Sequence, residues 1–208
     1  PKETRFDVGF FDSLKKAVST NHPAEDSASP DKPGSANYWT LVEQARKLVG
    51  EKKWEAAKAP LNTLIELCPN QSGHENAYAL LVSAHRGLKE TEQERVALEK
   101  WAASDVTALD AFSRLMELDE IAGNWKGVAH YADNFLAVNP LLPQPYRFLG
   151  RSNEELGDIA KAINAYQKSL LLDPVDPAEV HYRLGRLLHK NNDPSAKRQV
   201  LQALGDAP

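Results

Sequence analysis

The sequence predicts an all-α fold, an α-solenoid of about five helix-turn-helix units, and three regularities predict it. Prolines recur every thirty-four residues, at Pro140, Pro174 and Pro208. In phase with these prolines, two sets of apolar positions recur, one in each half of the repeating unit. Glycine, asparagine and aspartate stand between the halves, where one helix ends and the next begins. A period of this length is typical of helix pairs that stack on one another.

The two sets of apolar positions identify the helices of each unit. In the first half, aromatic residues stand three places before leucines, in the pairs Tyr78/Leu81, Phe112/Leu115 and Tyr146/Leu149. In the second half, one column holds the small residues Ala57, Val128, Ala162 and Ala196, and a column four places later holds Leu61, Leu98, Tyr166 and Val200. Spacings of three and four place these side chains on one face of a helix. The units therefore span about 38–71, 75–108, 109–142, 143–176 and 178–208, with residues 72–74 as an inserted loop.

Several residues mark where helices start or where their pattern is broken. Thr91 with Glu94 and Asp176 with Glu179 have the spacing of a capping box, in which two side chains satisfy free N–H groups of the first turn. Asn153 interrupts the apolar stripe of its helix. We therefore expect Asn153 near a turn or partly exposed.

The N-terminal residues differ in composition from the repeats. Residues 1–20 form a short segment in which Phe10, Phe11, Leu14 and Val18 would share one face of a helix. We expect this segment to cap the array or to end an upstream domain; the alternative is a segment that binds the groove of its own chain. Residues 21–36 contain three prolines and many small polar residues, which predicts a flexible linker.

The fourth unit resembles a known family most closely. Its motifs Tyr146–Gly150, Leu156–Asp158, Ala162-Ile163, Tyr166 and Asp173-Pro174 resemble the tetratricopeptide repeat (TPR). Val82 and Met116 replace the small residue that usually follows the leucine in this family. The resemblance covers roughly residues 38–208. It implies a right-handed superhelix in which the first helix of each pair lines a concave groove for a peptide or helix of a partner protein.

Basic residues on two predicted first helices form the candidate peptide-binding site. These residues are Arg147, Arg151, Arg183, Arg186 and Lys190. Arginines that share a concave surface hold carboxylates with two hydrogen bonds, so the expected partner is an acidic peptide or a chain terminus. The alternative is that these cations pair along their own helices, since Glu154 and Glu155 lie within a turn of Arg151 and Glu179 lies within a turn of Arg183.

The sequence predicts no catalytic, cofactor-binding or metal-binding residues. It contains no glycine-rich phosphate loop and no nucleophile elbow, and its single cysteine, Cys68, has no histidine nearby in sequence. His181 and His189 are eight residues apart on one predicted helix, a rise of about 12 Å that one metal ion does not span. We expect the histidines at 85 and 181 and the tryptophans at 54, 101 and 125 to pack in the core.

Composition narrows the classes of partner. The net charge is −4, which argues against nucleic acid, and the longest apolar run is far shorter than the roughly 20 residues of a membrane-spanning helix. We therefore expect a soluble protein of the cytoplasm or the bacterial envelope, because a lone cysteine fits either compartment.

Three functional hypotheses follow. The first is a non-enzymatic scaffold that binds a peptide or helix of a partner protein in the concave groove. The second is the C-terminal helical module of a larger bacterial enzyme, peptidase-like, in which the array positions substrate or assembles the enzyme; the sequence begins at Pro1 rather than at methionine, which suggests an upstream part. The third is a homodimer formed through the last helix, where Val200, Leu201 and Leu204 have no following unit to cover them.

Overall fold

The computed structural model describes residues 35–71 and 76–206, and these residues form ten α-helices and no strand. The helices are α2 Ser35–Gly50, α3 Trp54–Leu67, α4 Ala77–Gly87, α5 Thr91–Ser104, α6 Leu109–Ala122, α7 Trp125–Val138, α8 Pro143–Glu155, α9 Ile159–Leu171, α10 Pro177–Lys190 and α11 Ala196–Asp206. The predicted all-α class is confirmed. The predictions for residues 1–34, and for the inserted loop after residue 71, lie outside the described residues.

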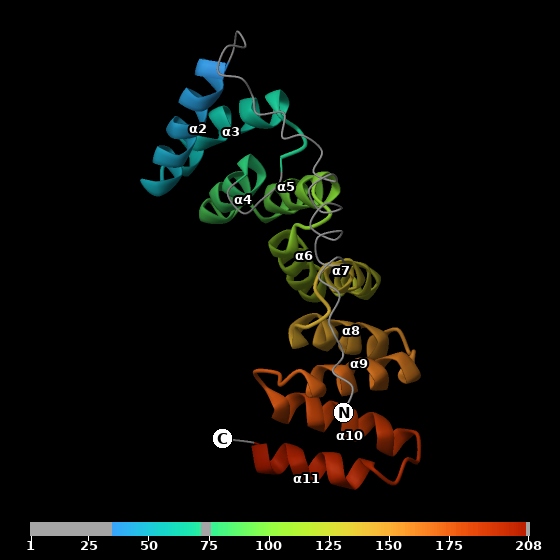
Figure 1. The fold of residues 1–208 in the computed structure, drawn as a ribbon. Coiled ribbons are helices and arrows are strands. Elements are labelled where there is room, and N and C mark those ends of the chain that lie inside the picture. The colour runs from blue at the N-terminus through green and yellow to red at the C-terminus, as the bar shows by residue number, and fades with distance from the viewer. Residues whose placement is uncertain (1–34, 72–75, 207–208) are drawn as a thin grey trace, which may run out of the picture. The chain divides into compact units, whose positions relative to one another are not determined.

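The helices from α3 onward pack in chain order. Each of them, from α3 to α10, packs against the helix that follows it, and Figure 1 shows this succession from α4 to α11. Residues 41–206 belong to one compact unit. Because the packing partners are close in sequence, the architecture is a helical-repeat solenoid, as predicted.

Turn residues end the first helices of the third and fourth pairs. Gly123 follows α6 with φ 69° and Gly157 follows α8 with φ 81°, a left-handed conformation that glycine adopts without strain. The next residue then caps the second helix: Asn124 accepts a hydrogen bond from the Gly127 N–H, and Asp158 accepts one from the Lys161 N–H. The sequence therefore encodes both turns locally.

One of the two predicted capping boxes does not form, and the other forms only one of its two hydrogen bonds. α5 has Glu90 as its N-cap, so Thr91 lies inside the helix and does not cap it, and no side chain caps this helix. The Glu94 carboxylate bonds to arginines instead of returning to the helix start. Asp176 caps α10 by accepting a hydrogen bond from the Glu179 N–H at 3.0 Å, as predicted. The Glu179 carboxylate instead bonds to Arg183.

The core contains part of the predicted apolar columns together with neighbouring apolar residues, whereas Tyr146 and Leu149 are half-buried and Val200 is exposed. Around α6–α8, a buried cluster contains Phe112, Met116, Val128, Ala132, Phe135 and Phe148. Around α9–α11, a second cluster contains Ala162, Tyr166, Val180, Leu184, Leu187, Leu188 and Ala196. Burying a Val, Leu, Met or Phe side chain completely stabilises the fold by about 1.5–3 kcal/mol relative to leaving that side chain exposed to water.

The prediction for Asn153 is correct in its first alternative, a position near a turn. The residue lies in the last turn of α8, but only 7 % of it is exposed. Its amide Nδ2 donates a hydrogen bond to the Leu149 carbonyl at 2.8 Å. A buried amide is tolerated here because the helix itself supplies the acceptor.

Candidate protein-binding surface

The first helices of successive pairs, α4, α6, α8 and α10, carry the side chains of the candidate site. Between α4 and α6 lies a hollow of about 350 Å³, which we call the α4–α6 hollow. Its lining includes Ser83 and Arg86 of α4, Trp101 of α5, and Ser113 and Arg114 of α6. Trp101 is almost fully buried, and its indole N–H has no hydrogen-bond partner among the described residues. The hollow therefore combines an aromatic wall with donors and acceptors.

A buried carboxylate organises the arginines of this hollow. Glu94 of α5 is 2 % exposed. Its Oε1 accepts hydrogen bonds from Arg86 Nε at 2.9 Å and from Arg114 Nε at 2.8 Å, and Arg114 also reaches Glu117 at 2.9 Å. Burial acts to raise the pKa of Glu94, but the hydrogen bonds from Arg114 and Arg86 outweigh it and lower that pKa. One buried charge thus fixes two arginines on neighbouring first helices.

Sequence reasoning missed this cluster, although one signal was present. Glu94 stands at the place that Ala57, Val128, Ala162 and Ala196 occupy in the other units. A carboxylate in a column of small apolar residues is costly to bury unless cations surround it. The exception in the column therefore marks the buried ion cluster.

Three of the predicted arginines join in one network between α8 and α10. Arg183 and Arg147 both approach Glu179, with N···O distances of 2.9 Å and 3.8 Å. Arg183 and Arg186 both approach Glu154 of α8, Arg183 at 3.5 Å. Three arginines face two glutamates, so the network keeps an excess of one positive charge. The Arg186 side chain, 54 % exposed, is the most accessible of the three.

The other two predicted residues lie apart from this network. Arg151 pairs with Glu120 of α6 at 2.8 Å, and its guanidinium carbon lies 5.4 Å from the centre of the Trp125 ring. Lys190 is the last residue of α10 and is exposed. The expectation of pairing along the same helix is correct for Arg183 with Glu179 and wrong for Arg151, because its partner is on the preceding first helix.

A second hollow lies at the start of α8 and α10. It has a volume of about 390 Å³ and is lined by Pro143, Arg147, Pro174, Asp176 and Glu179, among others. The first helices thus present two hollows and a set of ion pairs that link neighbouring units. Such a surface offers charged and polar groups to the backbone and side chains of a bound segment.

His85 and His181, two of the described histidines, take part in hydrogen bonds with neighbouring side chains. His85 Nδ1 lies 2.6 Å from Glu90, and His181 Nδ1 lies 2.6 Å from Gln199. Within the described ranges, no group of three or more His, Cys, Asp or Glu side chains is placed to hold a metal ion. Cys68 is exposed.

The predicted core tryptophans differ in depth. Trp101 is almost fully buried, whereas Trp54 and Trp125 are half-buried. Trp54 covers Gly87, where an added Cβ would meet the indole ring at 2.4 Å. Of these three tryptophans, only Trp101 fully confirms the prediction of packing in the core.

These features define a helical-repeat fold, and comparison with known proteins identifies the kind of repeat that one of its helix pairs matches. Residues 145–176 match the tetratricopeptide repeat. The fourth helix pair therefore matches the tetratricopeptide repeat, as its residues predict. Among curated proteins, no significant sequence match was found.

Solved structures share the fold at low sequence identity. YrrB, a TPR protein with an unusual peptide-binding site, is 18% identical with a TM-score of 0.64, and the match covers 94% of this chain and 93% of YrrB. A crystal structure of MamA is 18% identical with a TM-score of 0.63, covering 81% of this chain and 91% of MamA. MamA from Desulfovibrio magneticus RS-1 is 17% identical with a TM-score of 0.60, covering 81% and 93%.

None of the helices in residues 35–71 and 76–206 combines the length and the apolar character needed to cross a bilayer.

Proposed function

We propose that this protein is an interaction scaffold that binds a peptide or helix of a partner protein along its first helices. The observation that carries this proposal is the α4–α6 hollow, where two neighbouring first helices present Arg86, Ser113 and Arg114 beside a buried indole N–H without a partner. The arginine network of α8 and α10 extends the same kind of surface over the next first helices. YrrB, which has a similar fold and a peptide-binding site, supports this assignment.

The predicted residues Arg147, Arg151, Arg183, Arg186 and Lys190 belong to this proposal as contacts for carboxylates of the partner. The excess positive charge between α8 and α10 favours an acidic segment. Because each of the four arginines already pairs with a glutamate, they act as oriented donors rather than as free charges.

Photo-crosslinking tests the location of the groove. A photoreactive phenylalanine at Ser113, which lines the α4–α6 hollow, is expected to capture the partner. The same residue at Lys197, exposed on α11, is the matched control and should capture little. Equal capture from both positions would contradict the groove.

Charge reversal tests the arginines. The double variant Arg147→Glu/Arg151→Glu should lower the amount of that partner recovered by pull-down at least ~10-fold, because each reversed charge repels an acidic segment. Lys197→Glu/Arg198→Glu makes the same change on exposed residues of α11 and should have no effect. Circular dichroism checks that both variants fold.

The coding sequence upstream of residue 1 would separate this proposal from the alternative of a module in a larger enzyme.

A further inference from the structure

The second helices border a hollow that the proposed function does not use. α7, α8 and α9 surround about 730 Å³, which we call the α7–α9 hollow. Tyr146 and Leu149 of α8 and Ala165 of α9 form its buried and half-buried lining, while Lys161 and Lys168 of α9 are exposed beside it. A volume of this size accepts one or more large side chains of a partner.

The same hollow recurs two units earlier in the chain. A hollow of about 300 Å³ lies among α3, α4 and α5. Its Tyr78 and Ala97 stand sixty-eight residues before Tyr146 and Ala165, so the two linings occupy the same places in the repeat. A feature that recurs in phase with the repeat is set by the repeated residues and is not a local packing fault.

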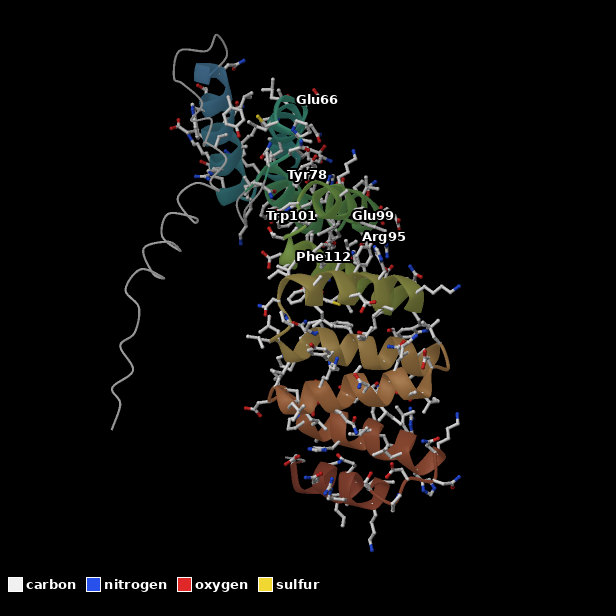
Figure 2. All side chains as sticks on the ribbon, turned by 45° about the vertical axis from the view of Figure 1, so that its right-hand side comes forward. Glu66, Tyr78, Arg95, Glu99, Trp101 and Phe112 are labelled. Carbon is white, nitrogen blue, oxygen red and sulfur yellow. The ribbon has the colours of Figure 1, made fainter. Side chains whose placement is uncertain are left out.

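Between these two hollows, larger side chains stand at the equivalent places. Tyr131 of α7 stands where α5 has Ala97 and α9 has Ala165, and Arg95 of α5 stands where α7 has Ala129. Arg95 bonds to the buried Asp119 of α6. Figure 2 shows Arg95 and Glu99 on one side of α5 and Trp101 on the other. Burial, with the charges of Glu99 and Asp119, raises the pKa of the half-buried Tyr131.

The charges beside the α7–α9 hollow indicate the chemistry of its partner. The Lys168 Nζ lies 5.7 Å from the centre of the Tyr146 ring, and among the described residues no carboxylate pairs with it. The Lys161 Nζ lies 2.8 Å from Oδ2 of Asp158, which is the residue that caps the start of the same helix. The lining contributes two lysines and one aspartate, Asp133. A carboxylate of a partner therefore finds an open cation next to an apolar surface.

An apolar side chain at the edge of the hollow supports the same reading. Leu156, which lines the hollow at the end of α8, is 45 % exposed. An apolar side chain of the partner would remove Leu156, Tyr146 and Leu149 from water together. The combination of an apolar depression and a neighbouring cation fits a segment that carries both apolar and acidic residues.

We propose that the α7–α9 hollow binds an acidic amphipathic segment of a partner protein. A leucine or aromatic side chain of that segment lies among Tyr146, Leu149 and Ala165, and a carboxylate lies against Lys168. This site is separate from the groove of the first helices, so the scaffold holds two segments at once.

The test uses a fluorescein-labelled amphipathic peptide of glutamate, leucine and phenylalanine, and a matched peptide with lysine in place of glutamate. Fluorescence anisotropy with the full chain should show saturable binding of the acidic peptide only. Ala165→Tyr, which introduces the residue found at the equivalent place in α7, should weaken binding at least ~10-fold by filling the hollow. Lys168→Glu should weaken it by a similar factor and improve binding of the basic peptide.

Two control variants separate this site from others. Lys197→Glu makes the same charge change on α11 and should bind the acidic peptide as the unmodified chain does. Arg147→Gln/Arg151→Gln removes two cations of the first helices and measures any binding that belongs to the groove, whereas the binding lost in Ala165→Tyr and Lys168→Glu belongs to the α7–α9 hollow. Thermal unfolding confirms that Ala165→Tyr folds, and Lys168→Glu alters only an exposed side chain. Absence of saturable binding, or binding that only the Arg147→Gln/Arg151→Gln variant weakens, would overturn the proposal.

Discussion

The third and fourth helix pairs, α6/α7 and α8/α9, repeat the same backbone pattern but place a tyrosine differently. α7 contains Tyr131-Ala132, and thirty-four residues later α9 contains Ala165-Tyr166, the same two residues in reverse order. Tyr166 is fully buried, and its ring lies so close to Gly150 that an added Cβ would meet it at 2.6 Å. Tyr131 is half-buried, and it stands at the place in α7 that Ala165, which lines the α7–α9 hollow, occupies in α9.

The first helices compensate for this exchange. Where α8 has Gly150 opposite Tyr166, α6 has Met116 in one buried cluster with Ala132. A small residue on one helix thus accompanies a large residue on the other, and the filled volume between the helices is kept. The core is therefore conserved between the two pairs, whereas at the same place on the second helices α7 has a half-buried tyrosine and α9 has an alanine that lines the hollow.

The largest expected difference between the pairs concerns the two tyrosines. Tyr166→Ala removes a fully buried ring and the hydrogen bond of its hydroxyl to Glu154, so we expect a loss of about 3–5 kcal/mol in the free energy of unfolding. Tyr131→Ala removes a half-buried ring, and we expect a loss of about 1 kcal/mol. Urea denaturation followed by circular dichroism measures both. Equal losses would refute the distinction between core and surface tyrosines.

The column of small residues gives a second contrast, between Glu94 of α5 and Ala162 of α9. Glu94→Gln removes the charge that holds Arg86 and Arg114, with an expected loss of about 2 kcal/mol at pH 7. Glu99→Gln, on the same helix but 44 % exposed in its side chain, should cost less than ~0.5 kcal/mol.

The same residue predicts a pH dependence. Because folding lowers the pKa of Glu94 from 4.5, its contribution to stability is complete above pH 4.5 and is lost as the pH falls through the lowered value. Stability of the unmodified chain should therefore decrease below pH 4.5 more steeply than that of the Glu94→Gln variant. Parallel curves from urea titrations across this range would contradict the role of the buried carboxylate.

The smallest expected effect concerns the contact between α8 and α9. Gly150→Ala gains helix propensity but forces the Tyr166 ring to move, so we expect a net loss of about 1 kcal/mol. Gly50→Ala is the matched control, because an added Cβ there meets no atom within 4 Å and should leave stability unchanged or slightly raised. Thermal denaturation compares the two. A gain in melting temperature for Gly150→Ala would show that the ring does not constrain this position.

Most of the fold was predictable because its determinants are periodic or local. The thirty-four-residue spacing places the aromatic and leucine columns, and Gly123-Asn124 and Gly157-Asp158 define their turns without help from the rest of the chain. Asn153 lies near a turn as predicted, but its burial was not predictable, because its amide bonds to the carbonyl of Leu149, a local partner that apolar periodicity does not consider.

The candidate surface was less predictable, because its contacts join successive first helices. Arg151 reaches Glu120, thirty-one residues away, whereas sequence reasoning sees acidic residues one turn along the same helix. Glu94 was recognisable only as an exception in its column, and its arginine partners depend on the packing of α4 and α6 against α5. Registers between helices, unlike periodicity within one helix, are set by tertiary packing.

The exchange of Tyr131-Ala132 for Ala165-Tyr166 is the central claim, because it explains why the α7–α9 hollow is open. The most direct test is a crystal structure of the triple variant Gly150→Met/Ala165→Tyr/Tyr166→Ala. We predict unchanged helix positions, a buried methionine between α8 and α9, and a tyrosine ring that fills the hollow of about 730 Å³. A hollow of undiminished volume, with the introduced ring turned into solvent, would contradict the account.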